Sequence, residues 1–472
     1  MKHIGAKKIA GSSLWLTGSF MLAKVSQLIA QVFLARLLTP QDFGIWGMVL
    51  IVTTLSALFK DGAIATVLVQ RGLDDKKLVD AVYSLGINIS VVMFVLQALT
   101  GFPLALFFGE PLVFPLTATV ALVFLIGAGA GSHGAVLQRQ MKFRELAIAD
   151  GIAGVARFAS LILFATLGYG VWSFVIAEIA MTTMDALLKR YWSGYRFTYY
   201  LIPERSAIRE VQAYITSLIG IHLAVYANTN SDNLIIGRLL GSESLGYYNL
   251  AYQLAMLPTY ALSQINNLNF SVLSQKDNQG QKAYLCKILE LYALLYAPLY
   301  GVAFVVAPGI IPLVYGHQWK PAVSLFQIIL IFAYARGFMS ILGTTLNAVN
   351  KPNINAAINW VLVPLSMATF FLGAKFAGVT GVAIAVAIFM GICATIWFWF
   401  ATSRATNWNI VVLLKPVLLP TIAIAITLLG LQAFPLPIYL QTIFVLVVYG
   451  GLISVFSCGR IKSIVFKITQ RF

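Results

Sequence analysis

The chain reads as one helical membrane unit that occurs twice. Arg36-Leu37-Leu38 and Arg238-Leu239-Leu240 lie 202 positions apart, and each triplet is followed five residues later by a hydrophobic residue and a glycine. Three more matches follow in the same order: Phe108-Gly109 with Tyr315-Gly316, Leu137-x4-Lys142 with Leu346-x4-Lys351, and Gly170-Val171 with Gly381-Val382. Their offsets grow from 207 through 209 to 211, as expected if loops lengthened after a duplication. A duplicated bundle predicts two lobes around a central site, which is the architecture of a transporter.

The hydropathy of the chain requires a bilayer. Hydrophobic residues make up 60% of the 472 residues and charged residues only 10%, which is more apolar surface than a soluble fold can hide. Because one membrane-spanning helix takes about 20 apolar residues, we expect an all-α integral membrane protein with about fourteen transmembrane helices. They are predicted near residues 11–36, 44–68, 81–107, 112–132, 146–167, 170–188, 211–236, 245–270, 286–314, 322–345, 355–374, 378–400, 412–431 and 436–457.

This map divides the chain into four parts. Residues 1–188 form an N-lobe with helices 1–6, and residues 211–400 form a C-lobe with helices 7–12. Residues 189–210 between them are basic and aromatic, as in a linker at the membrane interface. Residues 401–472 carry helices 13 and 14 and a basic tail, without a counterpart in the repeat.

The distribution of basic residues predicts the orientation. On this map, 25 of the 32 Lys and Arg residues fall on one side of the membrane. By the positive-inside rule that side is the cytoplasm, and both termini lie there. The net charge of +16 then meets an anionic lipid surface, so it does not indicate nucleic-acid binding.

Several kinds of chemistry lack their motifs. The map leaves no long loop for an extramembrane catalytic domain, and no Walker-type loop ends in Lys-Ser or Lys-Thr. The four histidines and three cysteines are scattered, which gives neither a metal cluster nor a disulfide framework. We therefore expect a protein that is not an enzyme and needs no cofactor or bound metal.

Three cations fall well within predicted helices: Lys24, Arg157 and Arg336. Charges in hydrocarbon are costly and normally face a bundle interior or an aqueous cavity. A cationic patch of this kind suits a phosphate or diphosphate headgroup. The alternative is a purely structural ion pair, and Arg157 with Glu178 is the natural choice.

Polar side chains recur on the first helix of each repeat. Thr17, Lys24, Gln27 and Gln31 share one face, and the offset of 202 maps the last three onto Tyr226, Thr229 and Asn233. We predict that a polar cavity is lined by Thr17, Gln27, Gln31, Tyr226, Asn230 and Asn233. Hydrogen bonding between helices is the structural alternative. The carboxylates Asp150, Glu178 and Asp232 are candidates for binding a coupling Na+ or proton.

Two stretches resemble a known family. The segment FLARLLTPQDFGIWGMVLIVTTLSALFKDGAIATVLVQR (33–71) is similar to the N-terminal signature of bacterial polysaccharide exporters of the colanic-acid and teichuronic-acid type. VLQRQMKFRELA (136–147) resembles a second segment of the same group, which belongs to the multidrug/oligosaccharidyl-lipid/polysaccharide superfamily. Arg36, Asp42 and Gly44 match the signature but lie at a helix end, so we expect them to be structural.

The resemblance implies a fold and a function. The fold is that of the V-shaped multidrug and toxin extrusion (MATE) transporters, with a basic central cavity. The function is that of a flippase in the bacterial inner membrane, which moves an undecaprenyl-diphosphate-linked oligosaccharide to the outer leaflet by alternating access. Membrane lipids, and a polysaccharide polymerase as a partner, are implied by the family alone.

Two other functions are compatible with such a chain. A cation-coupled multidrug antiporter of the same fold would use Asp150 and Glu178, although the three embedded cations disfavour a cationic cargo. A scaffold for glycan-assembly enzymes would need no polar stripes within its helices.

Overall fold

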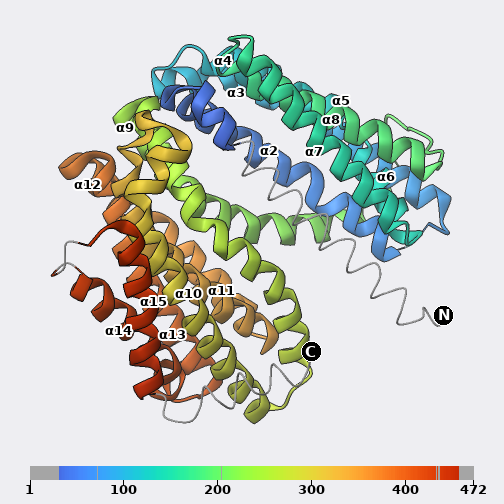
Figure 1. Cartoon of the computed structure of the whole chain (residues 1–472). Coiled ribbons are helices and arrows are strands. Elements are labelled where there is room, and N and C mark those ends of the chain that lie inside the picture. Colours follow the sequence, from blue (N-terminus) through green and yellow to red (C-terminus); the bar gives the residue numbers. More distant parts are fainter. Residues whose placement is uncertain (1–30, 72, 204, 432, 434–435, 457–472) are drawn as a thin grey trace. The chain divides into compact units, whose positions relative to one another are not determined.

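The computed structural model describes residues 31–71, 73–203, 205–431, 433 and 436–456 (Figure 1). Within these residues every regular element is a helix, so the prediction of an all-α fold is confirmed. The helices are α2 (Pro40–Arg71), α3 (Lys76–Phe108), α4 (Val113–Val120), α5 (Leu122–Ile126), α6 (Ala130–Arg139), α7 (Phe143–Thr166), α8 (Trp172–Ser193), α9 (Arg205–Ser274), α10 (Asn278–Tyr315), η1 (His317–Trp319), α11 (Ala322–Ala348), α12 (Pro352–Ala385), η2 (Val386–Cys393), α13 (Ala394–Thr406), α14 (Ile410–Leu431) and α15 (Ile438–Phe456).

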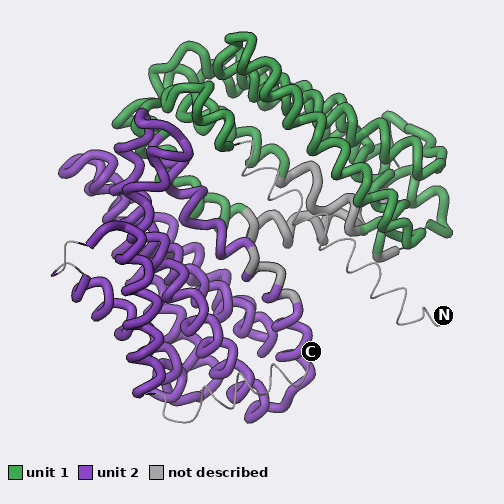
Figure 2. Tube along the Cα trace, viewed as in Figure 1, with its two compact units in different colours: residues 1–246 green, residues 247–472 purple. Residues whose placement is uncertain are grey.

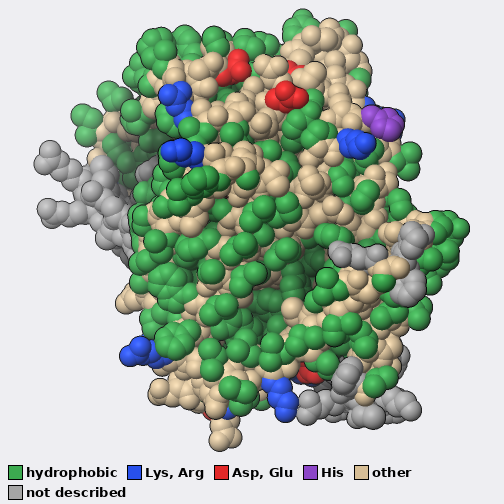
Figure 3. Space-filling model, turned by 90° about the vertical axis from the view of Figure 1, so that its left-hand side faces the viewer, with side chains coloured by type: hydrophobic (Ala, Val, Ile, Leu, Met, Phe, Trp, Pro, Cys, Tyr) green, Lys and Arg blue, Asp and Glu red, His purple; other side chains and the backbone are tan. Residues whose placement is uncertain are grey.

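Seven stretches of the described chain are helical, long and apolar enough to cross a membrane. They are Lys76–Phe108, Phe143–Thr166, Asn278–Tyr315, Ala322–Ala348, Pro352–Thr406, Ile410–Leu431 and Ile438–Val455. Large hydrophobic side chains point outward on these helices, and one face of the molecule is covered mainly by such side chains (Figure 3). These features make the chain a multi-pass membrane protein, whereas the total of fourteen spans stays a prediction.

One predicted span is not a single helix. Residues 112–132 were expected to be continuous, but the segments Val113–Ile126 and Ala130–Arg139 meet at an angle of 41°. Gly129, with a φ of 79°, lies in the break between α5 and α6. Glycine adopts this left-handed conformation without strain, so the sequence Gly127-Ala128-Gly129 supplies the bend.

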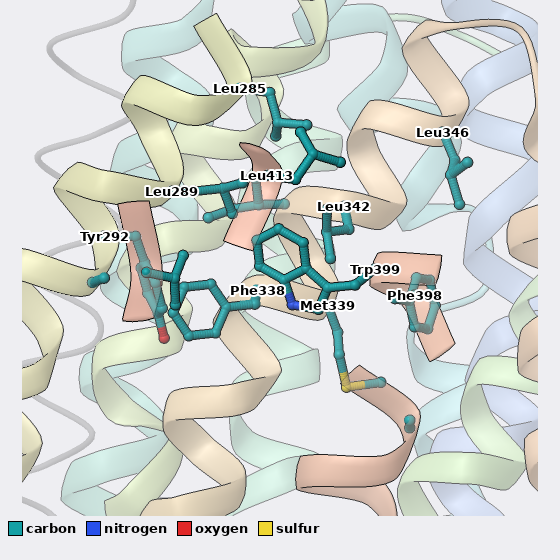
Figure 4. Packing of buried hydrophobic residues seen from close by; sticks show 14 of the residues in the cluster. Leu285, Leu289, Tyr292, Phe338, Met339, Leu342, Leu346, Phe398, Trp399 and Leu413 are labelled. Atoms are coloured by element: carbon teal, nitrogen blue, oxygen red, sulfur yellow. The ribbon is translucent and has the colours of Figure 1, made fainter. Parts of the chain in front are cut away.

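The chain divides into two compact units, residues 1–246 and 247–472 (Figure 2). In the first unit α2 packs on α3 and α6, and α7 packs along α8. In the second unit α10 packs on α11, α14 and α15, while α11 also packs on α12 and α13. The core of the second unit lies where α10, α11, α13 and α14 meet, around Tyr292, Phe338 and Trp399 (Figure 4). The predicted boundaries of lobes and linker stay a prediction.

Two of the later sequence matches between the repeats have the same local structure. Gly109 ends α3 and Gly316 ends α10, and both have positive φ. The backbone N–H of Lys142 donates to the Leu137 carbonyl at 2.9 Å, and that of Lys351 donates to the Leu346 carbonyl at 2.8 Å. The next helices, α7 and α12, begin directly after these two lysines. Residues 209 positions apart therefore have the same local structure here, in addition to their sequence match.

The match of Gly170 with Gly381 is not accompanied by a shared local structure. Gly170 precedes α8 with a φ of 55°, and the glycine with positive φ near Gly381 is Gly378, with a φ of 58°. Gly378 marks a break inside α12. Gly381 instead lies beyond that break, where an added Cβ would meet the Gly373 carbonyl oxygen at 2.0 Å.

Gly44 of the first repeat and Gly246 of the second each pack against the backbone of the other repeat. A Cβ added to Gly44 would lie 1.7 Å from the Ser242 carbonyl oxygen, and one added to Gly246 would lie 1.8 Å from the Pro40 carbonyl oxygen. Gly44 corresponds to Gly246, and Pro40 to Ser242, at the offset of 202. Close approach of backbones through small residues is typical of helix contacts in membranes. Both glycines are therefore required by packing.

Prolines within the spans leave backbone carbonyls that side chains satisfy. A proline cannot donate to the carbonyl four residues before it, and lipid offers no replacement donor. In the second unit Pro298, Pro308 and Pro416 free the carbonyls of Leu294, Phe304 and Val412. These accept hydrogen bonds from Tyr449 Oη at 3.0 Å, Gln327 Nε2 at 2.9 Å and Cys286 Sγ at 3.8 Å. Each bond joins two helices, so each proline creates a tie between neighbours.

We predict that Tyr449→Phe destabilises the protein by about 1 kcal/mol, because the Leu294 carbonyl then has no donor. In a Pro298→Ala background the restored N–H supplies that donor, and the same substitution should cost much less. Unfolding of the purified protein in mixed micelles measures both effects. The exposed Tyr439→Phe is the matched control. An equal loss in the two backgrounds would contradict this account.

Candidate functional site

Embedded charges line the contact between α7 and α8. Arg157 on α7 forms an ion pair with Glu178 on α8. One end of the same contact holds Lys189, whose Nζ lies 3.0 Å from Asp150 Oδ1 and 2.7 Å from Asp185 Oδ1. Because the helices are antiparallel, the seven-residue steps from Asp150 to Arg157 and from Glu178 to Asp185 bring these charges together. Opposite charges thus hold α7 and α8 together. The three carboxylates outnumber the two cations by one.

The contact between α7 and α8 includes three of the predicted site residues. The pairing of Arg157 with Glu178 is the structural alternative named from the sequence, and it is present. Asp150 is held by Lys189, a residue that sequence analysis had counted with the cytoplasmic loop and not with the site. A headgroup role for Arg157, and an ion-binding role for Asp150 or Glu178, stay predictions that would first require these pairs to open.

Arg336 lies near the middle of α11 and is half-buried. Within the described part of the chain its guanidinium makes neither an ion pair nor a hydrogen bond. One turn further along, Ser340 Oγ accepts a hydrogen bond from Asn266 Nδ2 of α9 at 2.7 Å. Of the two predicted headgroup cations that the structure describes, Arg157 is therefore neutralised by a carboxylate and Arg336 is not.

The predicted lining residues of α9 share one half-buried face. Tyr226, Asn230 and Asn233 follow at steps of four and three, which places them on one side of the helix. The Tyr226 hydroxyl donates to the Ile51 carbonyl of α2, and Asn230 Nδ2 donates to the Tyr226 carbonyl at 3.0 Å. Gln31 is buried in a helix over 31–37. Thr17, Lys24 and Gln27 lie outside the described residues.

Asp232 occupies another face of α9. Its side chain is only 4% exposed, and the neighbouring Asn228 and Ser231 on this face are buried as well. Asp232 Oδ1 accepts the backbone N–H of Asn233 at 2.9 Å. Ser231 Oγ and Asn233 Oδ1 have no hydrogen-bond partner within the described residues. A buried carboxylate is a group that can take up a proton or a hard cation.

The signature residues have structural contacts, as expected. Asp42 Oδ2 accepts hydrogen bonds from the Thr39 backbone N–H at 2.9 Å and from Thr39 Oγ1 at 2.8 Å, at the start of α2. Gly44 makes the close backbone contact described above. The equivalent of Arg36, Arg238, lies over the Phe107 ring with its guanidinium carbon 5.5 Å from the ring centre.

The segment over 194–203 is bound along α3, which sequence analysis missed. Thr198 N–H donates to Asp80 Oδ1 at 3.0 Å, Tyr200 N–H donates to Ser84 Oγ at 2.9 Å, and Asn88 Nδ2 donates to the Leu201 carbonyl at 3.0 Å. Asp80, Ser84 and Asn88 follow at steps of four on one face of α3. A polar stripe in an apolar helix was the available signal. This segment is therefore fixed to α3.

Comparison with known proteins defines first a fold class. The structure is similar to that of "Lipid II flippase MurJ, inward closed conformation", with a TM-score of 0.75 and 15% identity over 93% of this chain and 98% of the other. It is also similar to an inward-facing multidrug resistance MATE family transporter of the MOP superfamily, with a TM-score of 0.61 and 15% identity over 84% and 98% of the two chains. The chain has the fold of these transporters.

The family then follows from the sequence. A family model described as "Polysaccharide biosynthesis protein" matches residues 33–324, and the chain belongs to this family. The teichuronic acid biosynthesis protein TuaB of Bacillus subtilis (strain 168) is 24% identical over 75% of this chain and 74% of its own length. The lipopolysaccharide biosynthesis protein WzxC of Escherichia coli (strain K12) is 24% identical over 76% and 73%. The resemblance seen in residues 33–71 and 136–147 is thereby confirmed.

We predict that the Arg157–Glu178 pair is mainly structural. Arg157→Gln or Glu178→Gln alone leaves one half-buried charge without its partner and should lower stability by roughly 1–3 kcal/mol. The double variant Arg157→Gln/Glu178→Gln should recover much of that loss, as should the exchange Arg157→Glu/Glu178→Arg. Thermal unfolding in detergent measures the coupling between the two positions. Purely additive losses would show that the two side chains act independently.

Proposed function

We propose that this protein is a flippase for surface-polysaccharide synthesis. Its cargo is an undecaprenyl-diphosphate-linked oligosaccharide, which it moves across the bacterial cytoplasmic membrane by alternating access. The observation that carries the proposal is Arg336 in the middle of α11, for which the described residues provide no ion pair or hydrogen bond, in a chain of the polysaccharide biosynthesis family with a transporter fold. The name of MurJ as a lipid II flippase supports a lipid-linked cargo.

The chemistry of Arg336 fits a diphosphate. A guanidinium in hydrocarbon without a carboxylate is costly unless an anion or water reaches it for part of the cycle. Its planar fork of donors matches two phosphate oxygens. Binding of the diphosphate would relieve the cost of the buried charge, and release on the other side would restore it. This difference in free energy between the bound and the empty site would shift the protein between its conformations.

A coupling ion belongs at Asp232 on this proposal. The buried carboxylate would hold Na+ or, in its place, a proton. Asp150 and Glu178, the other two candidates, form ion pairs with Lys189 and Arg157.

We predict that Asp232→Asn uncouples transport. In proteoliposomes, lipid-linked sugar should still equilibrate between leaflets, but a Na+ or pH gradient should no longer drive its accumulation in one leaflet. The exposed Asp74→Asn serves as the control. Accumulation at the wild-type level in Asp232→Asn would remove this residue from the coupling site.

The sidedness of the basic residues supports two further parts of the proposal. With both termini in the cytoplasm, the basic loops face the anionic inner leaflet, where lipid-linked sugars are presented. A polymerase acting on the outer leaflet is the partner that would consume the product. Crosslinking of the outer loops in cells would identify it, and a protein that is captured only from the cytoplasmic side would contradict this arrangement.

Two alternative functions make different demands. A drug antiporter that used Asp150 and Glu178 for its cations would first have to open the ion pairs that hold both residues. A scaffold for glycan-assembly enzymes would have no use for an arginine inside a span that the described residues leave without a partner. Resistance to cationic drugs that depends on this protein, without an effect on lipid-linked sugars, would favour the antiporter.

We predict that Arg336→Gln slows transbilayer movement of undecaprenyl-diphosphate-linked oligosaccharide at least about tenfold, because one charge-assisted bond to phosphate is lost. Arg336→Lys should retain part of the rate, since it keeps the charge but not the fork. The assay follows access of a membrane-impermeant reagent to the lipid-linked sugar in proteoliposomes. Arg404→Gln, at an exposed position on α13, is the control. Equal rates for the two glutamine variants would remove Arg336 from the site.

A further inference from the structure

A row of polar positions runs along one side of α11. Arg336, Ser340, Gly343 and Asn347 follow at steps of four, three and four, so they share one face over about 16 Å at 1.5 Å rise per residue. By the helical period this face lies on a different side of α11 from the core residues Phe338, Leu342 and Leu346. Arg336 and Ser340 are half-buried, and Asn347 is exposed.

Neighbouring helices extend the row with amides. On the α9 side, Asn266 Nδ2 donates to Ser340 Oγ at 2.7 Å, and Asn269 Nδ2 donates to Asn266 Oδ1 at 3.1 Å. On the α12 side, Asn355 Nδ2 donates to Asn347 Oδ1 at 3.2 Å, and Asn359 Nδ2 donates to Asn355 Oδ1 at 3.1 Å. We call Ser340, Asn347, Asn266, Asn269, Asn355 and Asn359 the amide row. It carries no charge and ends at Arg336.

Gly343 lets the row on α11 and the row on α12 approach each other. The position is buried, and a Cβ added there would lie 3.4 Å from Asn355 Oδ1. The small residue thus leaves room for the Asn355 amide beside the α11 backbone.

The corresponding positions of the first repeat lack most of these groups. At the structural offset of 209, Arg336, Ser340 and Asn355 correspond to Gly127, Gly131 and Leu146. At the offset of 202, Asn266 and Asn269 correspond to Ile64 and Val67. Two positions stay polar, since Asn347 and Asn359 correspond to Gln138 and Asp150. The row is therefore largely a property of the second repeat.

We infer that the amide row recognises the sugar part of the cargo, next to the diphosphate held at Arg336. This inference rests on the proposed function. A side-chain amide both donates and accepts hydrogen bonds, as a sugar hydroxyl does. The absence of charge in the row selects neutral, hydroxyl-rich sugar residues, and its length admits several linked rings. Ser340, Asn347, Asn355 and Asn359 would make the contacts with sugar, whereas the buried Asn266 and Asn269 would hold Ser340 in place. The row is thus distinct from the cation that binds the diphosphate.

The test is a competition on the full chain in lipid nanodiscs. The probes are undecaprenyl diphosphate without sugar and the undecaprenyl-diphosphate oligosaccharides extracted from the source cells, mixed in equal amounts. Mass spectrometry of the lipids retained by the protein gives the ratio of sugar-bearing to sugar-free forms. The variants are Asn347→Leu with Asn355→Leu in the row, Asn353→Leu as an exposed control on α12, and Arg336→Gln.

We expect the wild type and the control to enrich the sugar-bearing form. The row variant should lose that enrichment about tenfold while it retains the sugar-free form as before. Arg336→Gln should lose both forms together. Unchanged enrichment in the row variant, or a parallel loss of both forms, would overturn the inference while leaving the flippase proposal standing. If the wild type retains neither form, the proposed function fails and the inference with it.

If the Asn347→Leu/Asn355→Leu variant does not fold, the Ser340→Ala variant tests the inference in its place. This substitution removes one hydroxyl and little volume, and we expect the same selective fall in enrichment of the sugar-bearing form. Retention of full enrichment by a folded Ser340→Ala protein would contradict a role for the central part of the row.

Discussion

Hydrocarbon offers no hydrogen bonds, so each polar group within the membrane must find its partner in the protein. The second unit meets this demand at its prolines, where Tyr449, Gln327 and Cys286 supply donors for carbonyls that lack their helical N–H. The first unit meets it with charges, since α7 and α8 pair Arg157 with Glu178 and place Lys189 between two carboxylates. In both units, the hydrogen bonds and ion pairs that satisfy these polar groups also join two helices.

Arg336 stands out against this background because the described residues give it no such partner. The first repeat has glycine at the equivalent position, and its embedded arginine is held by a carboxylate. The two repeats thus differ in polar content. The first pairs Arg157 and Lys189 with carboxylates within one helix contact, and the second combines a cation that the described residues leave unpaired with a row of neutral amides. On our account the second repeat carries recognition of the headgroup.

The sequence predicted those features that depend on long periodic patterns. Apolar runs located the helices, the repeat offsets held at Gly109 and Lys142, and Arg157 was correctly matched with Glu178. Features that depend on tertiary contact were missed. Lys189 was assigned to a loop because its two carboxylates come from different helices, and the bend at Gly129 interrupts a run that is apolar throughout. Asp80, Ser84 and Asn88 were passed over because their partners are backbone groups more than a hundred residues away.

The most direct test of the central claim is the sidedness of lipid-linked sugar in cells. The protein is depleted, and the undecaprenyl-diphosphate oligosaccharide accessible at the outer surface of the inner membrane is measured against the total. Our account predicts that the sugar accumulates on the cytoplasmic side and that re-expression of the wild-type chain restores its distribution, whereas Arg336→Gln does not. An unchanged distribution after depletion, with the total pool intact, would contradict the assignment of this protein as the flippase.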